Sequence, residues 1–245
     1  MSDSEPPAEQ RRPSRPRKRW LRRLSTALIV VGVAVMAWSF VVWRWDDPFT
    51  SLYTRWQQER LSDRYAAVVE KVAPKTVVPG TTNRAEAVRK IERAAGAFRS
   101  SSHEGDPIGR IIVPHLALSA IVVNGTGSSS LRKGPGRDLR TFLPGQGQLV
   151  YIAGHRTTYA APFSHIDRLV PGDRVTLEMP YGTFTYAVTG HSIVSADDLS
   201  VLRSHGREVV ALQACHPRFF ATQRYIVWAR PITFTPHGGR TYPGA

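Results

Sequence analysis

The chain has 245 residues, a formal net charge of +14 and one cysteine, Cys215. Its basic residues form no stripe interleaved with aromatic side chains, so we expect no nucleic-acid partner. A single cysteine excludes an internal disulfide and a cysteine-based metal site. The only adjacent acids after residue 105, Asp197 and Asp198, are too few for a hard cation, which takes about six to eight oxygen ligands. We predict no metal and no cofactor.

A basic tail and an apolar run open the chain. Residues 1–23 contain eight Lys or Arg against three acids, and the twenty residues 24–43 carry no charge. A helix of this length spans roughly 30 Å, the thickness of a bilayer's hydrocarbon core. Trp20, Trp43 and Trp45 flank the run, where indole rings favour the membrane interface. We therefore predict a transmembrane helix over residues 24–43 that contacts the lipid bilayer.

The charges also predict the orientation of this helix. Only three Arg lie between residues 44 and 63, so the positive-inside rule keeps the tail 1–23 in the cytoplasm and the remainder outside. A cleaved signal peptide is the alternative, but its apolar region would be shorter, roughly 7 to 15 residues, and would end in a small-residue cleavage site. The run ends instead in Val-Val-Trp-Arg-Trp. We expect a single-pass protein of the cell membrane with an extracellular C-terminal part.

The composition and residue pattern of residues 44–105 are typical of a partly helical linker. Apolar residues between 50 and 72 have helical spacing, Pro74 and Pro79-Gly80 interrupt the pattern, and residues 85–98 are rich in helix formers. We predict an extracellular, solvated stalk with two helices.

Residues 106–235 alternate short β-rich runs with turn residues, and are followed by a short C-terminal tail, 236–245. The candidate strands are 109–113, 118–123, 148–153, 174–179, 183–195, 208–215 and 224–231. Pro180-Tyr-Gly182 is typical of a hairpin turn, and short helices are expected near Leu131 and over 163–169. A mainly β domain that forms a closed or partly closed barrel is the simplest architecture, because closure pairs most sheet edges.

Cys215 ends one candidate strand and Arg224 begins the next, so pairing of these strands would bring the two residues together. An extracellular lone thiol is an inert buried group, the partner of another chain, or a nucleophile. His155 follows strand 148–153 in a polar loop, where reactive groups are usually presented. His216 directly follows Cys215, so its side chain should point to the face of the strand opposite to the thiol. His115 lies beside Pro114 in a turn, where an exposed side chain is the simple interpretation. By position alone, three further histidines stay open as partners of the thiol: His165, His191 and His205.

Cysteine, histidine and arginine together suit acyl transfer. The thiolate is a nucleophile that forms a thioacyl intermediate. Histidine can donate a proton to a leaving amine. Arginine keeps its charge and therefore can only hold a carbonyl or a developing oxyanion.

Two motifs resemble those of sortases, and most closely class E sortases of Gram-positive bacteria. They are Ala153-Gly-His155-Arg-Thr-Thr-Tyr159 and Cys215-His-Pro-Arg-Phe219, the second followed by Arg224. The likeness extends in matching order through Gly134-Pro-Gly136, Leu143-Pro-Gly145 and Pro171-Gly-Asp173.

The resemblance implies a membrane-anchored cysteine transpeptidase with an eight-stranded β-barrel, and it makes Cys215, His155 and Arg224 the catalytic residues. Such an enzyme cleaves a Leu-Ala-any-Thr-Gly or Leu-Pro-any-Thr-Gly sorting signal between Thr and Gly. The clients are secreted proteins that carry this signal near the C-terminus, and the acceptor is an amine of a peptidoglycan precursor or a pilin. We expect substrate contacts from Ala214, Arg156, Thr157, Thr158, Tyr159 and His216.

The chain departs from the family pattern just before the cysteine. Sortases usually read Thr-Leu-any-Thr-Cys, whereas this sequence reads Ala211-Leu-Gln-Ala214-Cys215. We expect the hydroxyl missing at Ala214 to affect rate or signal preference. Two alternatives stay open: a non-catalytic sortase relative that binds sorting signals, and another cysteine transpeptidase acting on peptidoglycan. Cysteine transpeptidases that act on peptidoglycan usually carry a Ser-His-Gly-Cys motif, and Gln213-Ala-Cys-His216 does not match it.

Overall fold

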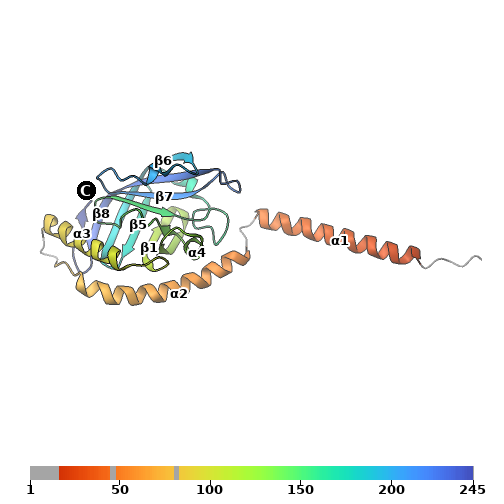
Figure 1. The fold of residues 1–245 in the computed structure, drawn as a ribbon, viewed down its shortest axis with the longest axis horizontal. Coiled ribbons are helices and arrows are strands. Elements are labelled where there is room, and N and C mark those ends of the chain that lie inside the picture. The colour runs from red at the N-terminus through yellow and green to blue at the C-terminus, as the bar shows by residue number, and fades with distance from the viewer. Residues whose placement is uncertain (1–16, 45–47, 80–82, 245) are drawn as a thin grey trace, which may run out of the picture. The chain divides into compact units, whose positions relative to one another are not determined.

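The computed structural model describes residues 17–44, 48–79 and 83–244. It contains two compact units, residues 1–45 and 46–245. The described part of the first unit is one helix, α1 (Arg17–Arg44), drawn at the red end of the colour range in Figure 1. Among the described residues, one segment is long and apolar enough to cross a membrane, Trp20–Val41 in α1, with a mean hydropathy of 2.2. Trp45, expected at the membrane interface, lies outside the described residues.

Eight strands of the second unit close into a barrel, as the resemblance implies. They follow one another around the ring in the order β6-β5-β1-β2-β3-β4-β7-β8, and pairing of β6 with β8 closes it. The strands are β1 (Pro107–Val113), β2 (Leu118–Asn124), β3 (Gly136–Arg137), β4 (Leu149–Ala153), β5 (Arg174–Met179), β6 (Gly182–Ser195), β7 (Val209–His216) and β8 (Gln223–Pro236). Short helical pieces join them: η2 (Pro114–Leu116), α4 (Ser128–Leu131), η3 (Ile166–Arg168) and η4 (Leu199–Leu202).

The hairpin between β5 and β6 illustrates how the local pattern directs the fold. Met179 pairs with Gly182, so the chain reverses over Pro180 and Tyr181 as the sequence predicts. Tyr181 is fully buried, and its hydroxyl donates to the carbonyl of Pro144 at 2.8 Å. Every second residue is buried along β5 and along β6 as far as Val188, the period expected when one face of a strand lines a core.

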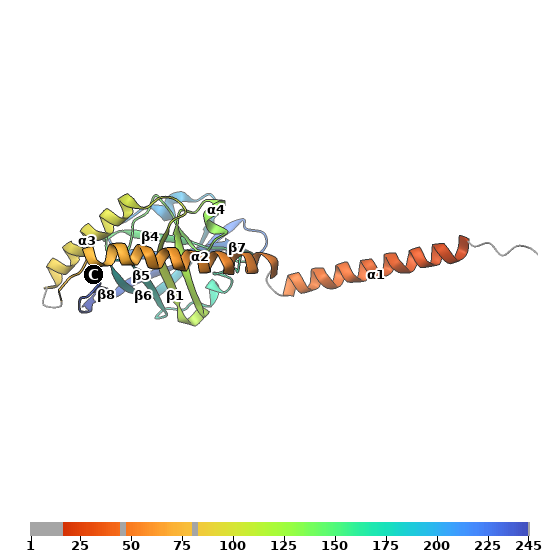
Figure 2. The same cartoon turned by 90° about the horizontal axis from the view of Figure 1, so that it is seen from below.

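Two helices before the barrel pack on it, so the expectation of a solvated stalk is wrong. In α2 (Pro48–Val72), Leu61 and Tyr65 are buried against Ile121 and Val123 of β2. Tyr65 also donates its hydroxyl to the carbonyl of Glu178 at 2.7 Å. Figure 2 shows α2 lying along the barrel. The helical spacing of its apolar residues was visible in the sequence, but the surface that covers them belongs to a strand more than fifty residues away.

The second of these helices, α3 (Arg84–Ser101), contributes directly to the barrel core. Its buried residues recur every three or four positions and join the main core cluster: Ala87, Ile91, Ala95 and Phe98. The Asn83 side chain caps the helix by accepting from the backbone N–H of Glu86 at 2.9 Å. The short helix η1 (Ala73–Lys75) follows α2 directly.

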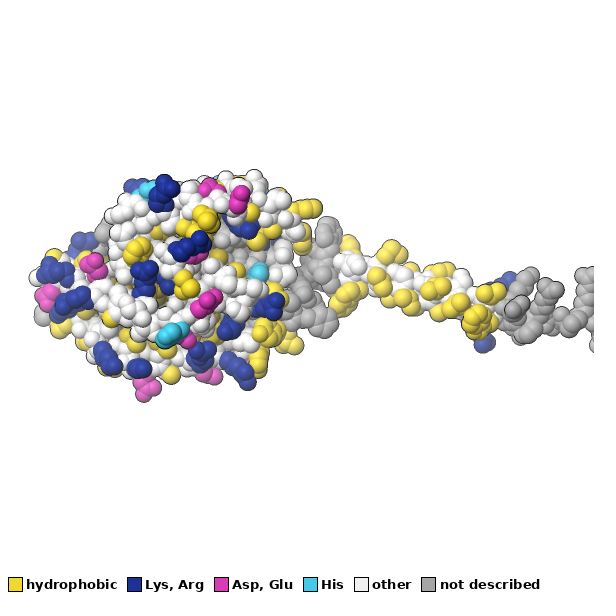
Figure 3. Space-filling view, viewed as in Figure 1, with side chains coloured by type: hydrophobic (Ala, Val, Ile, Leu, Met, Phe, Trp, Pro, Cys, Tyr) yellow, Lys and Arg dark blue, Asp and Glu magenta, His cyan; other side chains and the backbone are white. Residues whose placement is uncertain are grey.

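The expected C-terminal tail also belongs to the folded unit. Strand β8 continues to Pro236, and β9 (Tyr242–Pro243) pairs with it. Tyr242 is buried in the main core. In Figure 3, Lys and Arg side chains are dispersed over the face of this unit that is in view, and apolar side chains run along α1.

Candidate active site

A cleft of about 280 Å³ lies on the outer face of β4, β7 and β8. On β7, Leu212 and Ala214 point into the main core, whereas Gln213 and Cys215 line the cleft, because successive side chains of a strand point to opposite faces. The segment 196–202 covers this outer face. Consequently β4 is buried on both faces.

Cys215 and Arg224 are direct partners in the pairing of β7 with β8, and both line the cleft. Cys215 is partly exposed. The Nη1 atom of Arg224 donates to the carbonyls of Ala221 and Gln223 at 2.8 and 2.9 Å. These two bonds hold the guanidinium at the start of β8, which pairs with the strand end that carries Cys215.

His155 also lines the cleft, at the end of β4. The N–H of Gly154 donates to the carbonyl of Gln213 at 2.9 Å, so the β4–β7 pairing continues to the residue before His155. The His155 ring lies 5.0 Å from the Tyr159 ring, between centroids, and the Arg132 guanidinium carbon lies 5.9 Å from the centroid of that Tyr159 ring. Burial lowers the pKa of His155 below its ordinary value, and the positive charge of Arg132 lowers it further. Once protonated, His155 is therefore a stronger acid than a solvent-exposed histidine.

The other candidate histidines do not line this cleft. His115 contacts Asp173, with 2.7 Å between Nδ1 and Oδ2. His191 stacks on Tyr225 with ring centroids 4.9 Å apart. Among the described residues, His155 is the one histidine that shares the cleft with Cys215.

Comparisons with known proteins agree with this geometry. A model of the sortase domain matches residues 111–232. The chain is 28% identical to Sortase D of Bacillus subtilis (strain 168) over 161 residues, which cover 60% of this chain and 80% of that protein. It is 31% identical to Sortase A of Bacillus anthracis over 121 residues, or 49% of this chain and 57% of that one. The crystal structure of sortase E1 from Streptomyces coelicolor, with a tripeptide in its active site, superposes with a TM-score of 0.51 at 26% identity, covering 56% of this chain and 94% of that one.

The chain belongs to the sortase family. Members of this family are cysteine transpeptidases. The SrtA sortase from Actinomyces oris gives a similar superposition, with a TM-score of 0.53 at 26% identity over 56% of this chain and 85% of that one.

Three of the residues expected to contact substrate point away from the sortase cleft. Ala214 is fully buried in the main core, so a hydroxyl at this position would not face the cleft. Arg156 is also buried, and its Nη1 atom lies 3.0 Å from Nδ1 of His216. Neither residue of that pair lines the cleft, and His216 faces away from Cys215 as predicted.

The remaining expected contacts lie in the loop that follows His155. Thr157, Thr158 and Tyr159 are all partly exposed. The carbonyl of Thr158 accepts from the N–H of Ala161 at 2.9 Å, and Tyr159 takes up a left-handed backbone conformation with φ of 52°. Of the three, Tyr159 lies against the ring of His155.

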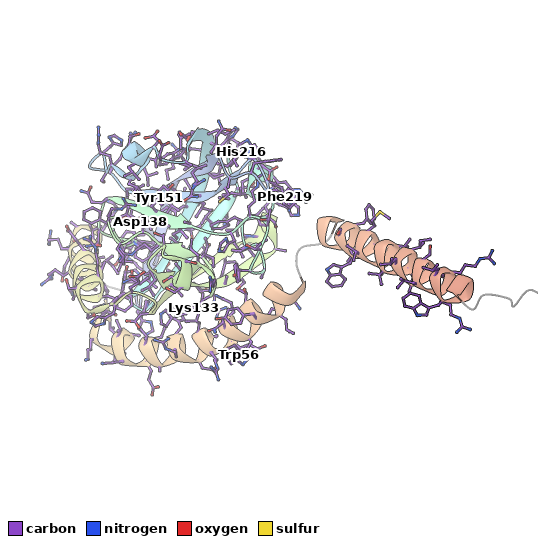
Figure 4. All side chains as sticks on the ribbon, turned by 45° about the vertical axis from the view of Figure 1, so that its right-hand side comes forward. Trp56, Lys133, Asp138, Tyr151, His216 and Phe219 are labelled. Carbon is purple, nitrogen blue, oxygen red and sulfur yellow. The ribbon has the colours of Figure 1, made fainter. Side chains whose placement is uncertain are left out.

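The cleft also contains polar residues that the sequence reasoning missed. Asp138 accepts from Nε and Nη2 of Arg140 at 2.9 and 2.8 Å. Burial raises the pKa of Asp138, but the hydrogen bonds and charge of Arg140 outweigh it and hold that pKa below its ordinary value. Tyr151 lies beside Asp138, as Figure 4 shows, and burial raises its pKa. For Tyr151 the sequence did contain a signal, because the alternation of side chains along β4 places Tyr151 on the same face as Ala153, and both line the cleft.

The adjacent acids Asp197 and Asp198 have local partners. The side chain of Asp198 accepts from the N–H of Ser200 at 2.9 Å and caps η4, as expected for a helix start. Asp197 accepts from the hydroxyl of Ser195. Within the described residues, no group of three or more His, Cys, Asp or Glu side chains is arranged to hold a metal ion.

Proposed function

We propose that this chain is an active, membrane-anchored sortase in which Cys215 is the nucleophile, His155 the general acid and Arg224 the oxyanion-stabilising cation. One observation carries the proposal: three residues from separate segments of the chain line a single cleft. None of the three side chains belongs to the main core or to the apolar cluster on the outer face, so packing alone does not require this arrangement.

The reaction starts from the Cys215 thiolate and the protonated His155. The sulfur attacks the carbonyl carbon of the signal's Thr, and a C–S bond forms while the carbonyl becomes an oxyanion. The Thr–Gly C–N bond then breaks, and His155 gives its proton to the departing amine. An acceptor amine attacks the thioacyl carbon, a C–N bond replaces the C–S bond, and the amine's proton passes to His155.

The surroundings of His155 and Arg224 suit these roles. Because burial and Arg132 lower the pKa of His155, its protonated form gives up a proton readily. Arginine is a cation in proteins, and Nη1 of Arg224 is held by the carbonyls of Ala221 and Gln223. Such a fixed cation stabilises negative charge on a carbonyl oxygen without further reorganisation.

The substrate class follows from the resemblance to class E sortases. We propose a Leu-Ala-any-Thr-Gly or Leu-Pro-any-Thr-Gly signal on secreted proteins, and a peptidoglycan or pilin amine as acceptor. The apolar helix α1 would anchor the enzyme in the cell membrane, with the basic tail in the cytoplasm and the barrel outside.

The test uses residues 48–245, because α2 and α3 pack on the barrel and a fragment that starts near residue 100 would lack them. The protein is incubated with both peptides, with and without triglycine, and mass spectrometry looks for a Thr-acyl adduct on Cys215. Cleavage should disappear in Cys215→Ala and fall severely in His155→Ala and Arg224→Ala. Absence of both adduct and cleavage would favour a non-catalytic relative. Turnover of peptidoglycan peptides alone would favour the other transpeptidase class.

A further inference from the structure

We propose that Arg156 is a positioning residue that locks the His155 loop to the strand end carrying Cys215. This inference rests on the proposed function, because it assigns a role in the same reaction. Arg156 follows His155 directly, yet its side chain is 5% exposed and turned away from the cleft. It therefore cannot make the substrate contact that the sequence predicted.

The guanidinium joins three segments of the chain. Nη1 donates to the backbone carbonyl of Cys215 at 3.2 Å. Nη1 also lies 3.0 Å from Nδ1 of His216, which must accept because arginine has no acceptor. Nη2 lies 2.9 Å from Oδ1 of Asp167, in η3. One side chain thus ties the loop after β4, the end of β7 and the η3 segment together.

The sequence order makes this contact relevant to the chemistry. His155 and Arg156 are consecutive and face opposite sides, and so are Cys215 and His216. The two outward side chains are the proposed acid and nucleophile, while the two inward ones contact each other. A backbone shift that separates the inner pair therefore also moves the outer pair relative to each other.

A buried cation such as Arg156 needs partners for its charge. A buried charge is tolerated when it is paired and hydrogen-bonded. Arg156 has the carboxylate of Asp167, which is 49% exposed, and the face of the Tyr225 ring with its centroid 5.7 Å from the guanidinium carbon. A planar, forked guanidinium can reach all of these partners at once, whereas a lysine ammonium is a single point of donation. Lysine should therefore restore only part of the function.

The test uses the full chain in detergent, with Arg156→Met to remove charge and donors, and Arg156→Lys to keep the charge. A displacement of about 1 Å between reacting groups can cost on the order of 100-fold in rate. We expect Arg156→Met to lower the kcat for sorting-peptide cleavage by roughly 10- to 100-fold with KM changed less than about 2-fold. Arg156→Lys should recover part of that loss.

Arg137 offers a matched control. It is also a buried arginine, 3% exposed, and its Nε and Nη2 atoms donate to Oδ1 of Asn124 at 2.9 and 2.7 Å. It does not line the cleft. Arg137→Lys should lower the unfolding midpoint while leaving kcat within about 2-fold of wild type, well below that midpoint.

The alkylation rate of Cys215 by iodoacetamide is measured in parallel and needs no peptide. It should change in Arg156→Met and not in Arg137→Lys, because a shift of the inner pair changes the surroundings of the Cys215 sulfur. The inference is overturned if Arg156→Met keeps wild-type kcat and alkylation, or if only KM rises, as for a substrate contact. It is also overturned if Arg137→Lys loses as much activity at equal stability. A wild-type chain that cleaves no peptide contradicts the proposed function, and the alkylation rates then decide the positioning role alone.

Discussion

Replacing Gly154 by alanine should destabilise the loop that presents His155. A Cβ at this position would lie 2.6 Å from Cδ2 and 2.8 Å from Cε2 of Phe163, far inside the roughly 3.5–4.0 Å of a normal carbon contact. Phe163 is fully buried and its N–H donates to the carbonyl of His155 at 3.1 Å, so the ring cannot move without disturbing that loop. Overpacking of this kind costs about 1–3 kcal/mol.

The assay is urea unfolding of residues 48–245 for Gly154→Ala, Phe163→Leu and the double variant. Shortening Phe163 makes room for the new methyl group, so the double variant should be more stable than the sum of the single losses by at least about 0.5 kcal/mol. Gly190→Ala is the matched control, because nothing lies within 4 Å of its Cβ position. It should stay within about 0.5 kcal/mol of wild type. A Gly154→Ala protein as stable as this control, or additive losses in the double variant, would refute the steric argument.

Three further predictions concern charge, packing and a buried carboxyl. Arg132→Gln should raise the pKa of His155, because the positive charge that lowers it is gone; NMR titration of the imidazole would show an unchanged or lower pKa if the reasoning fails. Because this pKa is lower in the folded than in the unfolded chain, acidification protonates the unfolded chain first, and His155 should lower the unfolding free energy as pH falls. Leu61→Ala should lower the free energy of urea unfolding by about 2–5 kcal/mol, because Leu61 packs α2 on the barrel. A loss near zero would mean that this packing does not stabilise the fold. Tyr186→Phe should lower the unfolding free energy by about 1–3 kcal/mol, because the Tyr186 hydroxyl donates to the buried Glu208 carboxyl at 2.7 Å. If calorimetry shows no loss, the backbone N–H groups of Gly145 and Gly147 are sufficient donors for that carboxyl.

Much of the barrel could be predicted because its determinants are local. The period-two pattern and the turn at Pro180 located β5 and β6, and the end of one strand and start of the next placed Cys215 opposite Arg224. The helical spacing that identified α2 and α3 was equally local. Their role was mistaken because the covering surface comes from strands distant in sequence.

The candidate site also contains residues that the sequence could predict and residues that it could not. Cys215, His155 and Arg224 were recognisable from residue type and motif order, and the structure brings them to one cleft. Asp138, Arg140 and Tyr151 were missed because no short motif marks them. Each reaches the cleft only through the pairing of β3, β4 and β7.

The sequence alone determined the apolar helix, the positions of seven of the eight barrel strands and the reactive residue types, because charge runs, side-chain periodicity and motifs are properties of neighbouring residues. The two-residue strand β3 (Gly136–Arg137) is too short to show a period. Only the tertiary structure decided which face of each strand is buried. Alternation shows that Ala214 and Cys215 point in opposite directions, but it does not show which of them faces the core. Closure of the barrel put Ala214 inside, and the 196–202 segment covered the outer face above Cys215. The same closure buried Arg156 beneath the strand end and left His155 in the cleft.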